Sequence, residues 1–374
     1  MAFPESVAAL PVAAGLALVA LGLADIFLTI LHPDRDGPAS VALNRATWRV
    51  AVALASVAPR FAREIAALAG GLMIAATIVL WMALQVLGFA LLAWPYLDTG
   101  FDLHETAGAT FLDALYWSAI TFTTLGFGDI VPITPLWKIV ALAEALAGVA
   151  LVGAAITFLL SVYQGIDHRD RMSLRIYSET RRTWDGTTFV LRVLDEEGPE
   201  ALRRKLEAWA EQMRALHERL YRFQPLAFYV RTRSEKHEPE RMLEAVGEVA
   251  LTARLIARLP GFHAVRPAAD EIDIAYTEFA HSAIHHHGSR TCLRALDDPQ
   301  PTPEDREALA RLWTQVAREL DLPDPPTRDP VEEREILELA TRIRVFLDEL
   351  DRITRWRRIH LPPSSGRALA LGHR

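Results

Sequence analysis

The sequence predicts an all-α membrane protein, in which three transmembrane helices and one re-entrant helix are followed by a water-soluble α-helical bundle. Charged residues make up 17 of the first 164 residues but 70 of the last 210. The first part also contains three long apolar runs, and a helix needs roughly 20 apolar residues to cross a bilayer. The chain therefore divides into a membrane part and a soluble part.

The three spans follow from the apolar runs in order. The first covers 6–31 and is interrupted by Asp25. It lacks a basic start and is too long for a cleaved signal peptide. The second lies in 65–97, which holds no charged residue, and the third covers 139–166, interrupted by Glu144. Each is long enough to cross a membrane.

Two shorter segments are too short to span. Residues 109–123 are largely apolar and lead into a glycine-rich turn, which predicts a re-entrant helix. Residues 41–58 mix apolar residues with Arg45 and Arg49, which predicts an amphipathic helix at the membrane surface.

The basic residues predict the orientation. Five arginines lie in 33–64 and five more in 169–182, whereas the loop before residue 109 carries acids and no basic residue. Because basic loops stay inside, we expect a multi-pass protein of the plasma membrane. Its N-terminus and the loop after the re-entrant helix would lie outside, and its C-terminal domain in the cytoplasm.

Residues 121–129 read TFTTLGFGD and separate the last two predicted spans. Glycine reaches positive φ without steric cost, so Gly126 and Gly128 allow successive backbone carbonyls to point to one side. Leu125 and Phe127 would then face the other way. A dinucleotide-binding loop would need a preceding strand and usually a third glycine, and the flanks here are membrane-like.

This stretch resembles the selectivity filter of potassium channels, and 67–164 resemble the two-transmembrane pore unit of bacterial pore-loop potassium channels. The resemblance implies that four chains stack carbonyl rings that replace the water around K⁺. The K⁺ ligands would come from Thr124, Leu125, Gly126 and Phe127, and the filter would end at Gly128.

The same resemblance implies which residues support the filter and line the gate. Aromatic residues of the pore helix form a cuff, and Asp129 is expected to bond to Tyr116 or Trp117. Gly148 falls at the inner-helix hinge, with Gly153 as a second candidate. Bending at a gate and close packing against the pore helix are both open as explanations for Gly148. The residues expected to support the filter are Thr123, Asp129, Tyr116 and Trp117, and those expected to line the inner helix are Val152, Ile156 and Leu160.

Two positions depart from the pattern of the family. Leu125 stands where valine or isoleucine is usual, and Phe127 replaces a tyrosine that would bond to the cuff. Ile120 is not an acid, so carboxyl-coupled inactivation of the filter is not expected. These departures leave the degree of selectivity open.

The remaining expectations about the pore concern assembly and sensing. One chain supplies one quarter of a ring, so we expect a homotetramer in the lipid bilayer. No predicted span carries an arginine ladder, so no intrinsic voltage sensor is expected. Transported K⁺ is the implied ion, and no organic cofactor is predicted.

Two acids lie inside predicted spans, where an ionisable residue is a candidate for function. For both Asp25 and Glu144 we favour a structural hydrogen bond, with proton sensing as the alternative for Glu144. The candidate partners are Ser118, Thr121 and Thr123 for Glu144, and Arg45, Arg49 and Gln85 for Asp25.

The C-terminal part has apolar residues at helical spacing and breakers rich in proline and glycine. It lacks the strands and glycine fingerprint of a nucleotide-binding domain, and its ligand is unknown. Its charges are nearly balanced, which gives no indication of nucleic acid. The predicted helices are 199–221, 238–258, 267–284, 303–320 and 330–354.

Two residue clusters in this part give weaker indications of a binding site. His281 and His285 would share a helix face with Glu278, which permits a metal site, but no further ligand is evident, and we favour an exposed helix end for this cluster, which includes His286 and His287. Cys292 is the only cysteine, so no intrachain disulfide or thiolate metal cluster is expected. Residues 355–358 are a small basic stretch that we interpret as a solvated face or a membrane-surface contact.

We therefore divide the chain into four parts: 1–66 with the first helix and the surface helix, 67–166 with the pore domain, 167–365 with the helical bundle, and 366–374 as a disordered tail. The leading hypothesis is a potassium-selective channel. The alternatives are a weakly selective cation channel and a membrane-anchored signalling or scaffold protein with a silent pore. An enzyme is not expected, because no nucleophile–base pair or catalytic metal site is evident.

Overall fold

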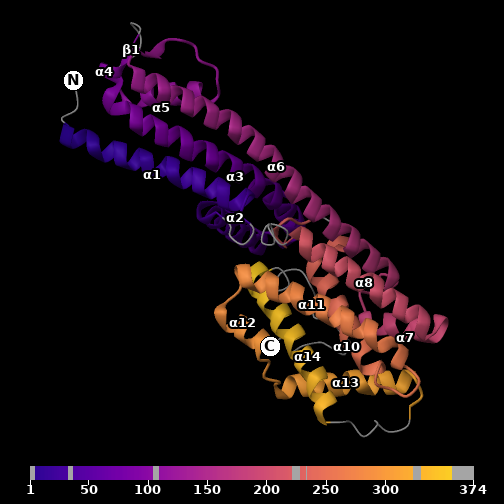
Figure 1. The fold of residues 1–374 in the computed structure, drawn as a ribbon. Helices are drawn as coiled ribbons and strands as arrows, with labels where there is room; N and C mark the ends of the chain where they lie inside the picture. Colours follow the sequence, from indigo (N-terminus) through magenta and orange to yellow (C-terminus); the bar gives the residue numbers. More distant parts are fainter. Residues whose placement is uncertain are drawn as a thin grey trace. The chain divides into compact units, whose positions relative to one another are not determined.

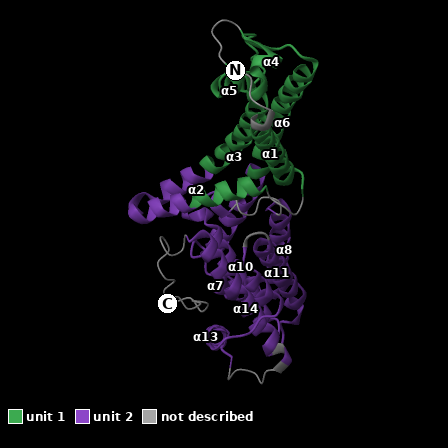
Figure 2. Cartoon of the chain, turned by 90° about the vertical axis from the view of Figure 1, so that its left-hand side faces the viewer, with its two compact units in different colours: residues 1–48, 71–162 green, residues 49–70, 163–374 purple. Residues whose placement is uncertain are grey.

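The computed structural model describes residues 5–32, 37–103, 109–220, 228–232, 234–322 and 330–355. The chain is almost entirely helical, as Figure 1 shows. It forms two compact units, the first made of 1–48 and 71–162 and the second of 49–70 and 163–374 (Figure 2). The predicted tail at 366–374 and the stretch 356–358 lie outside the described residues.

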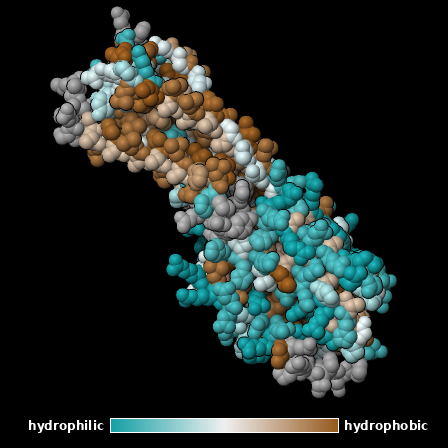
Figure 3. Space-filling model, viewed as in Figure 1, coloured by the Kyte–Doolittle hydropathy of each residue, from teal (hydrophilic) through white to brown (hydrophobic). Residues whose placement is uncertain are grey.

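The first unit is built on long apolar helices, and three segments are long and apolar enough to cross a membrane: Ala8–Ile30, Pro59–Gly100 and Pro135–Glu179. Apolar side chains cover this part in Figure 3. The predicted fold class is confirmed. The helices that begin in this unit or pass through it are α1 (Glu5–Ile30), α2 (Pro38–Val57), α3 (Ala62–Ala93), α4 (Leu97–Gly100), α5 (Phe111–Phe122) and α6 (Pro135–Glu179), with short 3-10 turns at Pro59–Phe61 and Trp94–Tyr96.

Helix α6 continues well past the predicted end of the last span and is 45 residues long. No glycine or proline interrupts 166–179. Ion pairs one turn apart support the extension, with 2.8 Å between Asp167 and Arg171 and 2.7 Å between Arg175 and Glu179. Hydropathy detects where the apolar run stops, which is a different boundary from the end of the helix.

A small sheet, which the sequence did not predict, lies beside the glycine-rich turn. Strand β1 (Phe101–Leu103) pairs with β2 (Ile130–Pro132) in antiparallel register, with Leu103 opposite Ile130. Strands of three residues give little periodic signal. The pairing ties the residue after Asp129 to a segment that lies before α5.

The second unit contains a helical bundle with its own core. Helix α10 (Pro239–Ile256) is buried along almost its whole length and packs against α7, α11 and α14. The five predicted helices are present with ends shifted by a few residues. In the described part of the bundle, α7 and α12 were missed. The other helices of the bundle are α7 (Gly186–Glu197), α8 (Pro199–Leu220), α11 (Arg266–His287), α12 (Arg290–Asp297), α13 (Pro303–Glu319) and α14 (Pro330–Thr354), with 3-10 turns at Glu235–His237 and His263–Val265.

Asp305 joins α13 to α14. It forms a capping box with Thr302 at the start of α13, and it accepts hydrogen bonds from Arg344 Nε at 2.6 Å and Thr341 Oγ1 at 3.2 Å. Burial raises the pKa of the Asp305 carboxyl, but the hydrogen bonds from Arg344 and Thr302 outweigh it and leave the pKa below its usual value. The ionised form therefore stabilises the fold.

We expect Asp305→Asn to lower the free energy of unfolding of the bundle by about 2 kcal/mol, because Arg344 loses its charged partner. Since the folded pKa is depressed, the stabilisation is present above the unfolded value of about 3.9 and is lost as the pH falls through the folded pKa. Chemical denaturation of the full-length protein in detergent at several pH values measures this difference.

Asp185→Asn is the matched control. Asp185 caps α7 by accepting from the backbone N–H of Thr188 at 2.8 Å. Asparagine caps a helix about as well as aspartate, so this variant should change stability by less than about 0.5 kcal/mol. Equal effects of the two substitutions would show that the contacts of Asp305 with α14 contribute nothing.

Candidate functional site

Helix α5 is fixed at its N-terminus by a capping box. The Thr110 hydroxyl accepts from the backbone N–H of Asp113, and the Asp113 carboxylate accepts from the backbone N–H of Thr110 at 3.0 Å. Such reciprocal bonds satisfy two of the donors that every helix start leaves open. Helix α5 thus has a defined start and ends at Phe122, where the TFTTLGFGD stretch begins to leave helical geometry.

In the backbone after α5, positive (left-handed) and negative φ values alternate from one residue to the next. Thr124, Gly126 and Gly128 have φ values of 57°, 53° and 82°, whereas Leu125 and Phe127 have negative φ. In a β-strand, successive carbonyls point to opposite sides. A left-handed φ at every second residue turns alternate peptide planes over, so that successive carbonyls point to the same side. Two of the three left-handed positions are glycines, which adopt this conformation without steric cost.

Hydrogen bonds fix the direction of the first two of these peptide planes. The backbone N–H groups of Leu125 and Gly126 both donate to the carbonyl of Ile120 in α5, at 2.8 and 3.2 Å. In a trans peptide the C=O points opposite to the N–H. The carbonyls of Thr124 and Leu125 therefore both point away from α5. Two successive oxygens on one exposed side are what a dehydrated cation needs as ligands.

The predicted supporting residues lie behind this segment. The Tyr116 hydroxyl lies close enough to the Asp129 carboxylate to interact with it, whereas Trp117 packs against Phe101. Thr123 Oγ1 donates to the carbonyl of Ala119 at 2.6 Å and so closes the last turn of α5. Of the two aromatic partners proposed for Asp129, the structure brings Tyr116 to it.

Trp117 instead belongs to an aromatic cluster that sequence reasoning missed. Its ring centroid lies 4.9 Å from Phe101 of β1 and 6.5 Å from Trp137 of α6, and Phe101 lies 5.2 Å from Trp137. All three side chains are buried. The cluster packs α5, β1 and the start of α6 together behind the segment of aligned carbonyls. Tryptophans in a run dominated by alanine and leucine were the available signal.

Gly148 is where α6 passes closest to the end of α5. A Cβ atom at this position would lie 1.9 Å from the carbonyl oxygen of Phe122, whereas one at Gly153 would meet nothing within 4 Å. Helix α6 runs through both positions without a break. Of the two explanations for Gly148, the geometry supports close packing against α5.

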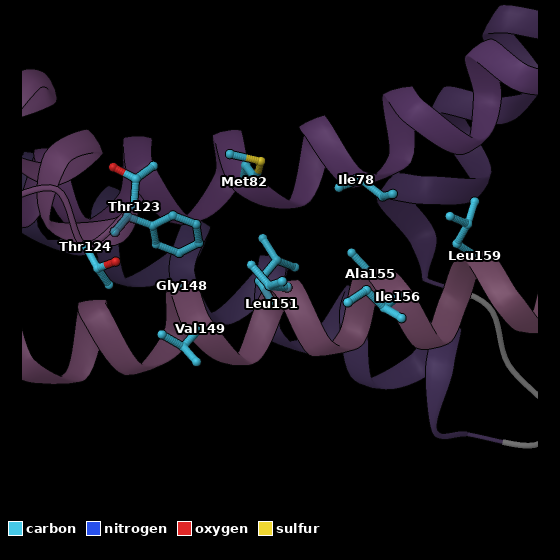
Figure 4. A pocket seen from close by; sticks show the side chains of 12 residues that line it. Ile78, Met82, Thr123, Thr124, Gly148, Val149, Leu151, Ala155, Ile156 and Leu159 are labelled. Atoms are coloured by element: carbon cyan, nitrogen blue, oxygen red, sulfur yellow. The ribbon is translucent and has the colours of Figure 1, made fainter.

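An apolar cavity of about 300 Å³ lies between α3, the end of α5 and α6 (Figure 4). Met82 and Ile78 of α3 face Leu151 and Ala155 of α6 across it. The predicted gate residues Val152 and Ile156 line the cavity, whereas Leu160 is exposed but does not line it. Thr123 and Thr124 close its end next to the carbonyl segment.

Glu144 is fully buried and forms a hydrogen bond with the hydroxyl of Ser118 in α5. Of the three hydroxyls considered from the sequence, the structure brings Ser118 to Glu144. The same Ser118 hydroxyl lies 2.9 Å from the carbonyl oxygen of Val86 in α3. One side chain of α5 thus connects this helix with both α3 and α6.

Asp25 does not contact any of the partners expected for it, so this expectation was wrong. It accepts hydrogen bonds from the backbone N–H groups of Ala39 at 2.7 Å and Ser40 at 3.3 Å, from the Ser40 hydroxyl, and from Trp81 Nε1 at 2.9 Å. The carboxylate therefore sits at the N-terminus of α2, where unpaired N–H groups and the helix dipole favour a negative charge. Gln85 bonds to the carbonyl of Val19 instead.

The histidine cluster of the bundle does not form a metal site in the described part of the chain. His281 Nδ1 lies 3.7 Å from Asp297 Oδ1, and His285 is exposed. Across the described residues, no three His, Cys, Asp or Glu side chains are grouped to hold a metal ion. The side chains of His286 and His287 lie outside the described residues.

Comparison with known proteins finds a matching family for the segment that contains this site. Residues 73–165 match the model of a family described as ion channel. The chain is 28% identical over 181 residues to the uncharacterized membrane protein YdjJ of Bacillus subtilis. The matched stretch covers 47% of this chain and 50% of that protein.

Relatives named as potassium channels match shorter segments. A voltage-gated potassium channel of Aeropyrum pernix is 39% identical over 54 residues, 14% of this chain and 18% of that protein. A two pore potassium channel of Oryza sativa is 52% identical over 48 residues, 13% of each chain. The chain thus spans half or less of the length of these relatives. No solved structure matches it significantly.

We expect Gly148→Ala to lower the stability of the full-length protein in detergent by about 3 kcal/mol, because the methyl group would overlap the Phe122 carbonyl. Gly153→Ala is the matched control on the same helix and should be neutral or stabilising by up to about 1 kcal/mol, since alanine is the better helix former. Thermal unfolding of both variants measures the difference. A hinge role for Gly148 would instead leave its stability unchanged.

We further expect Asp25→Asn to destabilise the protein by about 2 kcal/mol, because an amide N–H₂ would face the donors of Ser40 and Trp81. Trp81→Phe in the Asp25→Asn background removes one of those orphaned donors and should cost less than it does in the wild type. A double-mutant cycle from thermal unfolding measures this coupling. Additive effects would contradict the assigned contact.

Proposed function

Because residues 73–165 form an ion-channel domain, we propose that the chain assembles into a homotetrameric potassium channel. In this proposal K⁺ passes along the carbonyl oxygens of Thr124, Leu125, Gly126 and Phe127, with Gly128 closing the filter. Tyr116, Trp117, Thr123 and Asp129 hold the filter from behind.

Potassium conduction is supported above all by the direction of the filter carbonyls. The bonds from Leu125 and Gly126 to Ile120 turn the oxygens of Thr124 and Leu125 to one side. The alternating hand of the backbone continues this arrangement to Gly128. Backbone oxygens at successive levels replace the water of K⁺ without introducing a fixed charge.

Assembly of four chains is supported by what a single chain leaves exposed. The side chains of Leu125 and Phe127 are 63% and 68% exposed, and those of Val152 and Ile156 are 62% and 55% exposed. In a ring of four these side chains would be covered by the neighbouring chains. A closed ring of four also gives each ion ligands on all sides, which one chain cannot provide.

We place the channel in the plasma membrane with its N-terminus outside and its C-terminal bundle in the cytoplasm, as the basic residues indicate. The three candidate spans carry no arginine ladder, so we propose no intrinsic voltage sensor. Val152 and Ile156 form an apolar lining below the filter that can close by excluding water. A ligand of the bundle would then supply the gating signal.

A weakly selective cation channel is the second candidate, and Phe127 is the observation that favours it. Tyrosine at this position would offer a hydroxyl for bonding to the cuff, and phenylalanine has none. A filter held by fewer bonds adapts more readily to a smaller ion. A silent-pore scaffold is the third reading, and ion flux separates it from both channels.

We expect purified protein in a planar bilayer, with K⁺ on one side and Na⁺ on the other, to give a current whose reversal potential approaches the K⁺ equilibrium value. Gly126→Ala should abolish this current, because alanine at φ 53° adds about 1 kcal/mol of strain per subunit and disturbs the carbonyls. A reversal potential near zero would favour the weakly selective channel.

Gly71→Ala is the control for this substitution. A Cβ at Gly71 meets nothing within 4 Å, and the residue lies inside α3. Its current should match that of the wild type. A chain with no current under any ionic or pH condition, although correctly folded and tetrameric, would contradict the channel proposal and leave the scaffold.

A further inference from the structure

The hydroxyl of Ser118 lies between two oxygen atoms that both need a proton. One is the carbonyl oxygen of Val86, which can only accept, and lies 2.9 Å away. The other is Oε1 of Glu144, which is within hydrogen-bonding distance. A serine hydroxyl has one proton to donate. If it donates to Val86, the proton between Ser118 and Glu144 must come from Glu144.

The opposite arrangement leaves two repelling atoms in contact. If Ser118 donated to an ionised Glu144, its oxygen and the Val86 carbonyl oxygen would face each other at 2.9 Å without a proton between them. The ionised carboxylate would also lack compensation, because Glu144 is fully buried and its Oε2 has no hydrogen-bond partner in the described part of the chain. Burying an unpaired charge is strongly unfavourable.

From this geometry we propose that Glu144 is a protonated positioning residue, whose O–H to Ser118 sets the pore helix against the inner helix and whose ionisation closes the filter. The hydrogen bonds run in series from Glu144 to Ser118 and from Ser118 to Val86. The inference rests on the proposed conduction, since the filter is what the pore helix supports.

The relay of hydrogen bonds from Glu144 through Ser118 to Val86 lies where ionisation of Glu144 can affect the filter. Glu144 and Gly148 are one turn apart on α6, and Ser118 and Phe122 are one turn apart on α5. The two helices therefore meet twice, at Glu144–Ser118 and at Gly148–Phe122. Ionisation turns the Ser118 hydroxyl towards Glu144, which breaks the bond to α3 and loosens the end of α5, from which Thr123 and Thr124 continue into the filter.

Other titratable groups on the neighbouring elements are engaged elsewhere. On α5, Asp113 caps the helix and Tyr116 lies beside Asp129. Asp25 of α1 bonds to Ser40 and Trp81. Helix α3 has no charged residue from 65 to 93, and Lys138 lies nearly two turns before Glu144 on α6. Among the described residues, Ser118 is the side chain that the structure brings into hydrogen-bonding contact with Glu144.

The test compares K⁺ flux into liposomes for the wild type and Glu144→Gln as the pH of both solutions is raised from about 5 to about 10, a range that covers buried carboxyls. A glutamine N–H₂ replaces the O–H donor and cannot ionise. We expect wild-type flux to fall by about fivefold or more, the shift that follows the loss of one hydrogen bond, and Glu144→Gln flux to stay constant.

A second readout does not depend on conduction. The infrared spectrum of the wild type at neutral pH should contain the C=O stretch of a protonated carboxylic acid that titrates with the flux and is absent in Glu144→Gln. Asp113→Asn is the control, because it removes another pore-helix carboxyl and should retain both the band and the alkaline fall. Ser118→Ala should shift the band and weaken the pH dependence of flux.

Three results would overturn the proposal: no such band, a Glu144→Gln profile that falls like that of the wild type, or a band that titrates while wild-type flux stays constant. If the wild type conducts at no pH but the band is present and shifts in Ser118→Ala, conduction fails and the protonated link between the helices stands. Failure of the channel and failure of the relay are thereby distinguished.

Discussion

The carbonyl of Ile120 holds the segment whose backbone carbonyls point to one side, and the proposed conduction depends on that segment. It ends a helix, where carbonyls have no partner within the helix, and it accepts two N–H groups from the chain that follows. Helix α5 thereby orients a segment that has no regular structure of its own. Everything around it, from the capping box of Thr110 to the aromatic cluster and the β1–β2 pair, keeps this one helix end in place.

Polar groups in the apolar unit follow a common rule. Two of the buried ones join three helices each: Asp25 joins α1 to α2 and α3, and Ser118 joins α5 to α3 and α6. A membrane offers no water to satisfy such groups, so each must find a partner in the protein. Helix positions that apolar packing alone would leave free to slide are thus fixed by a few directional contacts.

The sequence predicted the long helices well, because apolar runs and helical spacing depend only on neighbours along the chain. It also located the segment whose backbone alternates between left-handed and ordinary φ, since Gly126 and Gly128 are needed for this local conformation. It failed where the partner lies far away in sequence. Asp25 was matched with arginines by charge, but it binds the N-terminus of a helix and an indole. The strands β1 and β2, and the role of Trp117 in the cluster, depend on tertiary contacts that no single segment encodes.

The cap that Asp25 provides has a consequence for how the protein is made. The acid enters the membrane with α1, where an unpaired aspartate costs up to about 3 kcal/mol during insertion. Its partners come later in synthesis, first the N-terminus of α2 and then Trp81 in α3. The buried aspartate of the first helix therefore lacks its full set of hydrogen-bond partners until the third helix has been synthesised. During synthesis of this unit, each new segment would thus stabilise a helix that was inserted into the membrane before it.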